Sequence, residues 1–171
     1  MSFKRFTLPS LIATAALLSM GAAHAVGTAT SNFNVLLTVK PKCIITNATV
    51  VDINLGGADV GATNVGSNTT FNMQCTKKTA YTITLAPTNT GAGTDNTGKL
   101  KGDNDATQLI DYALYSDAAY STAWGKLTKV GGTSSTTSSA GVDFKVYAKV
   151  ASVPDVPQDT YRDAVTITVT Y

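Results

Sequence analysis

Hydrophobic and polar residues alternate in short runs along most of the chain, with clusters of Gly, Asn, Ser and Thr between the runs. A period of two is typical of β-strands, because successive side chains of a strand point to opposite faces of the sheet. Helical periodicity is nearly absent after residue 25. Many short strands separated by turn residues indicate a sandwich or a barrel, so the pattern predicts an all-β domain.

The alternating runs also predict where the strands and loops lie. Strands are expected at residues 33–39, 43–45, 71–75, 81–85, 110–114, 142–150 and 165–171, and a weak one at 50–52 before the Gly56-Gly57 turn. Loops are expected from Thr88 to about Thr107, over the Ser/Thr/Gly tract 131–141, and around Pro154 and Pro157.

The two outermost runs are unusually placed. The last run ends the printed chain, with Thr166, Thr168 and Thr170 on one face; its other face carries Val165, Ile167, Val169 and Tyr171. A seven-stranded immunoglobulin-type sandwich needs a final strand beside the sixth. The pattern therefore predicts an incomplete immunoglobulin-like β-sandwich lacking its last strand. The spare strand at the beginning carries Phe33, Val35, Leu37 and Val39 on one face.

The first 25 residues predict a signal peptide. Lys4 and Arg5 precede a mostly apolar stretch over 6–20, and Ala23-His24-Ala25 has the small-x-small pattern that signal peptidase cleaves. An uncleaved anchor is the alternative, but the stretch is too short to span a bilayer. The expected organisation is a signal peptide over 1–25, an N-terminal segment over 26–40, and a body over 41–171.

Composition excludes several classes of function. Cleavage after Ala25 leaves 146 residues, enough for one domain, with 11 basic residues against 11 acidic ones. A near-neutral chain with one arginine lacks the basic footprint of a nucleic-acid-binding protein. The only histidine, His24, leaves with the signal peptide, so no histidine can act as a general base for a serine or threonine. No S-x-x-K motif stands before a helix. We expect neither an enzyme nor a small-molecule substrate or cofactor.

Two cysteines, Cys43 and Cys75, predict a disulfide. An even pair in an exported chain forms a bridge because the periplasm is oxidising. A zinc or redox pair is the alternative, but the spacing is not C-x-x-C and no histidine remains to complete a zinc site.

Asp95, Asp103 and Asp105 are candidate ligands of a hard cation, because such cations prefer clustered oxygen atoms. Their spacing does not fit the D-x-[DN]-x-[DN]-G loop, so a polar turn is the simpler interpretation and no metal site is predicted.

Four segments, taken in order, resemble a known family. They are Cys43-Ile44-Ile45, the strand from Phe71 to Cys75, the strand over 111–117 followed by Trp124-Gly125, and the ending over 161–171. The chain resembles the pilin subunits of archaic chaperone–usher systems, which share the spore coat protein U domain. It departs from the usual pattern before Tyr161, where the family places Gly and this chain has Thr160.

The resemblance implies a mechanism of assembly. Such a subunit lacks its last immunoglobulin strand, and a periplasmic chaperone fills the resulting groove. At the outer-membrane usher, the N-terminal segment of the next subunit replaces the chaperone. The implied partners are copies of the chain or related pilins, the chaperone and the usher. The implied location is a pilus at the cell surface, and the implied roles are adhesion and biofilm formation. A secreted, self-complemented coat protein is the alternative.

Overall fold

A computed structural model gives the fold for residues 27–47, 50–89, 95–135 and 141–171. The predicted signal peptide lies outside these ranges. The chain divides into two compact units, Met1–Leu37 and Thr38–Tyr171. Within the described ranges, no helix is long and apolar enough to cross a membrane.

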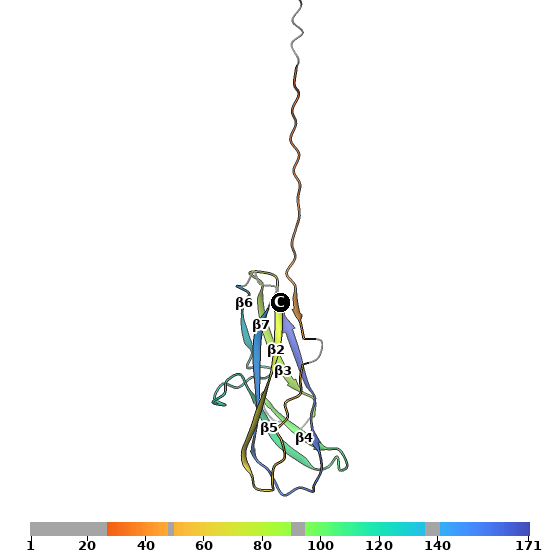
Figure 1. Ribbon diagram of the computed structural model, residues 1–171, viewed down its shortest axis with the longest axis vertical. Helices are drawn as coiled ribbons and strands as arrows, with labels where there is room; N and C mark the ends of the chain where they lie inside the picture. The colour runs from red at the N-terminus through yellow and green to blue at the C-terminus, as the bar shows by residue number, and fades with distance from the viewer. Residues whose placement is uncertain (1–26, 48–49, 90–94, 136–140) are drawn as a thin grey trace, which may run out of the picture. The chain divides into compact units, whose positions relative to one another are not determined.

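The second unit consists of two antiparallel sheets (Figure 1). The six-stranded sheet has the order β1-β2-β7-β5-β4-β8, and the three-stranded sheet has the order β6-β3-β9. No helix occurs in the described part of the chain, which confirms the prediction of an all-β domain. The strands are β1 (Cys43–Ile45), β2 (Thr63–Cys75), β3 (Ala80–Pro87), β4 (Thr97–Gly102), β5 (Leu109–Tyr115), β6 (Val130–Thr133), β7 (Val142–Ser152), β8 (Tyr161–Arg162) and β9 (Val165–Thr170).

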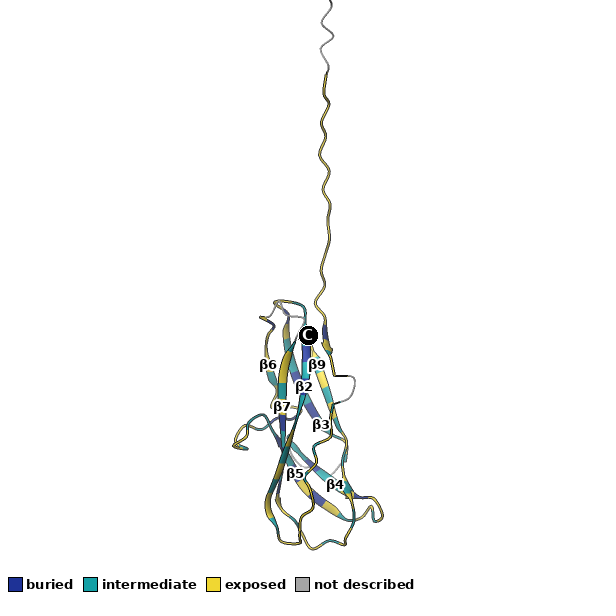
Figure 2. Ribbon diagram, in the orientation of Figure 1, coloured by how far each residue is buried: buried dark blue, intermediate teal, exposed yellow. Residues whose placement is uncertain are grey.

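The core lies between the two sheets and is centred on aromatic rings. Phe71 of β2 has its ring centroid 6.1 Å from that of Trp124 and 5.5 Å from that of Phe144 on β7. The indole nitrogen of Trp124 donates a 3.0 Å hydrogen bond to the carbonyl of Ile83 on β3. Since a buried indole needs a hydrogen-bond acceptor, this bond fixes Trp124 between the sheets. Figure 2 shows the buried positions running along β2, β3, β5 and β7.

Several strand predictions were wrong because they relied on apolar side chains. Strand β4 lies inside the predicted 88–107 loop, and β6 overlaps the start of the predicted 131–141 loop. Strand β2 begins at Thr63, well before the predicted 71–75 run, and pairs with β7 along nearly its whole length. Backbone hydrogen bonds form these ladders whatever the side chains are, so polar strands leave little periodicity in the sequence.

The weak strand predicted at 50–52 does not form. Ile53 and Leu55 nevertheless pack against the core, and the Thr69 hydroxyl donates a 2.6 Å hydrogen bond to the carbonyl of Val51. The stretch therefore contributes apolar side chains without joining a ladder. The strand predicted over 33–39 is not formed either, since residues 27–42 contain no β-ladder.

Candidate functional site: an open edge of the three-stranded sheet

Strand β9 is an edge strand. It pairs with β3 on one side, with Ile167 opposite Leu85 and Val169 opposite Ile83. Among the described residues it has no hydrogen-bonded neighbour on its other side. An exposed edge presents unpaired backbone N–H and C=O groups, which can pair with another strand.

The apolar face beside this edge is incompletely covered. Ile83 and Leu85 on the central strand β3 are fully buried, with 0% and 1% of their surface exposed. Their partners on β9, Val169 and Ile167, pack against the same core but are only half-buried, as is Val165. Burial therefore decreases towards the open edge. A further strand beside β9 would remove more apolar surface from water.

The start of β9 is held in place by Asp163. Its carboxylate accepts a 2.8 Å hydrogen bond from the hydroxyl of Tyr112 on β5 and a 2.9 Å bond from the backbone N–H of Asn89. The backbone N–H of Thr88 also donates to the carbonyl of Ala164 at 2.8 Å. Burial of the Tyr112 hydroxyl, followed by its bond to the Asp163 carboxylate, raises the pKa of Tyr112 well above its usual value. The tyrosine therefore remains a neutral donor.

The six-stranded sheet also has an open edge, at β1. Cys43 of β1 and Cys75 of β2 are joined by a disulfide, so the predicted bridge is confirmed. Strand β1 pairs only with the last three residues of β2. The bridge therefore attaches a short edge strand that a three-residue ladder alone would hold weakly.

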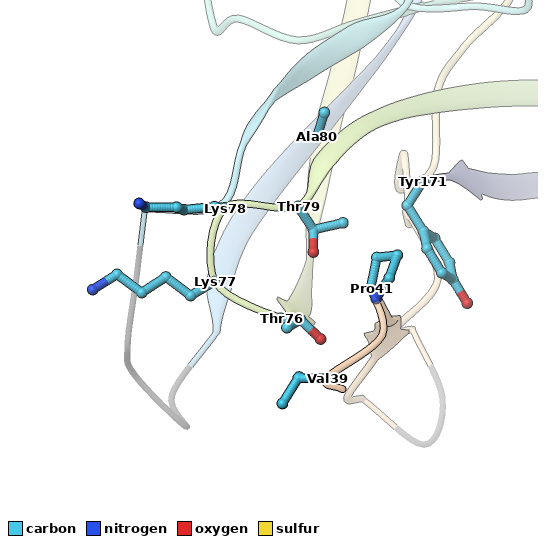
Figure 3. A pocket seen from close by; sticks show the side chains of 8 residues that line it. All are labelled: Val39, Pro41, Thr76, Lys77, Lys78, Thr79, Ala80 and Tyr171. Atoms are coloured by element: carbon cyan, nitrogen blue, oxygen red, sulfur yellow. The ribbon is translucent and has the colours of Figure 1, made fainter. Parts of the chain in front are cut away.

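A shallow cavity of about 450 Å³ lies where these two edges approach each other. Pro41, which precedes β1, and Tyr171, which follows β9, both line it (Figure 3). Thr76, Thr79 and Ala80, between β2 and the start of β3, complete the lining together with Val39, Lys77 and Lys78. Sequence periodicity could not have identified this cavity, since its residues come from three separate segments.

The N-terminal segment exposes large apolar side chains. Phe33, Val35 and Leu37 each have 86–87% of their surface exposed, and Val39 has 70%. Leu36, on the opposite face, is 88% exposed. Large apolar side chains that repeat with a strand period and remain exposed are typical of a segment that binds a partner.

The three candidate cation ligands have other partners. The carboxylate of Asp95 accepts hydrogen bonds from the backbone of Leu127 and from Thr128. Asp103 forms a 2.6 Å ion pair with Arg162. Asp105 accepts 2.6 Å and 2.9 Å bonds from Thr107. No group of three His, Cys, Asp or Glu side chains among the described residues could hold a metal ion.

Hydrogen bonds favour the charged form of two of these carboxyl groups, Asp95 and Asp105. The Thr107 side chain and backbone lower the pKa of Asp105. Burial acts to raise the pKa of Asp95, but the backbone N–H groups of Leu127 and Thr128 and the Thr128 hydroxyl together outweigh it, so this pKa is lowered overall. Neither carboxyl is held protonated as a general acid would be, and the arrangement serves to fix loops.

The family model of the Spore Coat Protein U domain matches residues 29–168. The chain belongs to the Spore Coat Protein U domain family, which confirms the resemblance found in the sequence. No curated protein matches the chain.

The solved structures that are similar to the chain include two complexes with a chaperone. One is the CsuC–CsuE chaperone–tip adhesion subunit pre-assembly complex from archaic chaperone–usher Csu pili of Acinetobacter baumannii. It has 17% identity and a TM-score of 0.55, over 78% of this chain and 41% of that one. The other is a chaperone–tip adhesin complex of CFA/I fimbriae biogenesis. It has 16% identity and a TM-score of 0.53, over 76% of this chain and 41% of that one. At this identity the likeness shows the fold alone, and the predicted immunoglobulin-like class is confirmed.

Proposed function

We propose that this chain is a structural subunit of a chaperone–usher pilus and that it polymerises by donor-strand exchange. The observation that carries the proposal is the open edge of β9, beside which Val165, Ile167 and Val169 are only half-buried. The face beside this edge is the acceptor groove, and the N-terminal segment of another copy is its occupant. Phe33, Val35, Leu37 and Val39 are the side chains that the segment inserts; Tyr171 continues the acceptor face beyond β9.

The partners follow from this mechanism. A periplasmic chaperone covers the groove before assembly, because an exposed apolar strand edge aggregates. An outer-membrane usher then exchanges the chaperone for the next subunit. The similar structures are complexes that contain a chaperone, which supports this part of the proposal. The chain is thus exported through the periplasm to the cell surface, where the polymer serves adhesion and biofilm formation without catalysing a reaction.

A secreted coat protein that fills its own groove is the second candidate, favoured by the description of the family. Production in a host with and without a chaperone and an usher of this class distinguishes the two. A pilus subunit gives surface fibres, visible by immunoelectron microscopy, only when both are present. A self-complemented protein gives a stable soluble monomer without either, and that result would overturn the proposal.

A further inference from the structure

The two ends of the second unit carry opposite charge. One end holds four exposed lysines: Lys77 and Lys78 line the cavity, and Lys40 and Lys42 flank Pro41, which also lines it. Hydrogen bonds hold the two lysine-bearing segments together, because the Thr76 N–H donates to the carbonyl of Lys42 at 2.8 Å and the Thr76 hydroxyl donates to the carbonyl of Lys40 at 3.4 Å. Figure 3 shows Lys77 and Lys78 extending in the same direction, away from Pro41 and Tyr171.

These lysines are not neutralised within the described part of the chain, where the two ion pairs are Lys99–Asp111 and Arg162–Asp103. The nearby Asp143 is engaged instead by the side-chain amide of Asn72, at 2.7 Å. We call the surface formed by Lys40, Lys42, Lys77 and Lys78 the lysine end.

The opposite end is built from three loops that carry five aspartates: Asp59, Asp103, Asp105, Asp155 and Asp159. Backbone bonds of 2.9 Å join Gly61 and Ala62 to Val153, and Asp159 accepts bonds of 2.8 Å and 2.6 Å from Asn104. Lys101 and Arg162 are the basic residues beside these loops, and Arg162 is paired with Asp103. The surface therefore has a net negative charge, and we call it the aspartate end.

Strand β2 separates the two ends. It runs from Thr63, next to the loop of Asp59, to Cys75, which precedes Lys77 and Lys78. Its 13 residues span about 40 Å at 3.3 Å per residue. Figure 1 shows the loop between β4 and β5 and the loop after β7 at the end of the sandwich away from the C-terminus. A separation of this size exceeds the Debye length of about 8 Å at physiological salt, so the two charges act on different neighbours.

The direction of β9 relates these ends to the open edge. Strand β9 begins at Val165, close to Arg162 and the aspartate end, and finishes at Thr170 before Tyr171 at the lysine end. Every strand pair in the described sheets is antiparallel. An incoming antiparallel strand would place its C-terminal residue near Val165. Val39 would then lie there, and Lys40 and Lys42 would follow directly against the aspartates. A parallel strand would bring the lysines of one copy to the lysines of the other.

We infer that the lysine end of each copy docks against the aspartate end of a second copy of this chain. The inference rests on the proposed function, because it concerns how successive subunits meet when a strand is exchanged. The pairing attracts subunits in the antiparallel orientation and repels them in the parallel one. The hydrogen bonds that Asp159 accepts from the Asn104 backbone and side chain lower its pKa, so the aspartate end retains its charge in mildly acidic surroundings.

Charge substitutions at each end test the inference. Mature chain released from its chaperone is allowed to polymerise, and light scattering gives the rate. Lys77→Glu/Lys78→Glu leaves two lysines against two glutamates and so removes the net charge of the lysine end. Asp59→Lys/Asp155→Lys leaves three aspartates against four basic residues and so removes the negative charge of the aspartate end; all four side chains are exposed. Each double variant should polymerise at least about tenfold more slowly than wild type at about 0.01 M salt. The difference should vanish at about 1 M salt, where the Debye length is about 3 Å.

The matched control is Lys126→Glu/Lys129→Glu, which makes the same charge change at exposed lysines of the loop after Trp124. It should polymerise within about twofold of wild type. If the end variants slow polymerisation no more than this control does, the inference is overturned.

The wild-type chain separates this inference from the proposed function. Wild type that forms no polymer even when the chaperone and the usher are both present overturns the proposed function and the end-to-end contact with it. If wild type polymerises at a rate that does not change with salt, the proposed function stands and the contact between the two ends is overturned. Polymerisation that slows as salt rises supports both, and this measurement does not depend on any variant folding.

Discussion

The hydroxyl of Tyr112 donates a 2.8 Å hydrogen bond to the carboxylate of Asp163, 51 positions later in the chain. Tyr112 lies on β5 of the six-stranded sheet, and Asp163 lies two residues before β9 of the other sheet. The bond therefore ties the strand that carries the open edge to the opposite layer of the sandwich. Because the edge can accept another strand only if β9 is held in place, this contact supports the proposed acceptor site from within the core.

Removing this hydroxyl should destabilise the domain without creating a cavity. A buried hydrogen bond to a charged group contributes about 1.5–3 kcal/mol, so Tyr112→Phe should lower the free energy of unfolding by about that amount. Urea denaturation of the chaperone-free chain measures it. The control is Tyr147→Phe on β7, whose ring contacts that of Tyr120 on the outer face and whose loss of a hydroxyl should cost under about 0.5 kcal/mol. Equal effects of the two substitutions would show that the Tyr112–Asp163 bond contributes nothing special.

The same contact predicts a dependence on alkaline pH. The pKa of Tyr112 is raised in the folded chain above the ordinary value of 10.0. Above that pH the unfolded chain releases the proton while the folded chain keeps it, so the free energy of unfolding falls as pH rises. The contribution of Tyr112 to the free energy of unfolding is fully present below about pH 10. Above that pH the free energy of unfolding falls by at most about 1.4 kcal/mol per pH unit, and by less if water reaches the hydroxyl.

Tyr112→Phe should remove this contribution. The melting temperatures of wild type and variant should therefore approach each other between about pH 9 and pH 11, because only the wild type loses this stabilisation as the pH rises. A constant difference in melting temperature over this range would mean that Tyr112 has the same pKa in the folded and unfolded chains.

Strands with one apolar face could be predicted from the sequence, and polar strands could not. The alternation at 142–150 and 165–171 gave β7 and β9 to within two residues at each end. Strand β4 was missed because it carries lysines at Lys99 and Lys101, and Lys99 is held by Asp111 across the ladder rather than by apolar packing. The half-buried face of β9 follows from its periodicity. The Tyr112–Asp163 bond does not, since no local pattern encodes a contact between residues so far apart.

The disulfide should be necessary for efficient export. The Cys43–Cys75 bridge closes a loop with a sequence separation of 32, for which chain entropy gives about 3.5–4 kcal/mol of stabilisation. Cys75→Ala should therefore sharply lower the amount of protein recovered from the periplasm, and the double variant Cys43→Ala/Cys75→Ala should behave alike. Recovery and melting temperature equal to those of wild type would show that the core alone is sufficient.

The donor role of the N-terminal segment is the central claim. Phe33, Val35, Leu37 and Val39 share one face of an extended strand. Burying four such side chains at about 1.5–3 kcal/mol each gives about 6–12 kcal/mol per junction, an upper estimate before ordering costs. An aspartate in place of Leu37 would be buried without a partner, which costs several kcal/mol. The residue is 87% exposed in the single chain, so the substitution should leave folding of the body intact.

Surface fibre yield of Leu37→Asp, with chaperone-bound subunit quantified in the periplasm, tests this claim most directly. We expect no fibres and a normal amount of chaperone-bound subunit. The control is Thr38→Asp, one residue along and on the opposite face, which should assemble nearly as wild type does. Normal fibres from Leu37→Asp would contradict the donor role. A Leu37→Asp subunit that fails to fold would instead assign the segment to its own domain and favour the self-complemented coat protein.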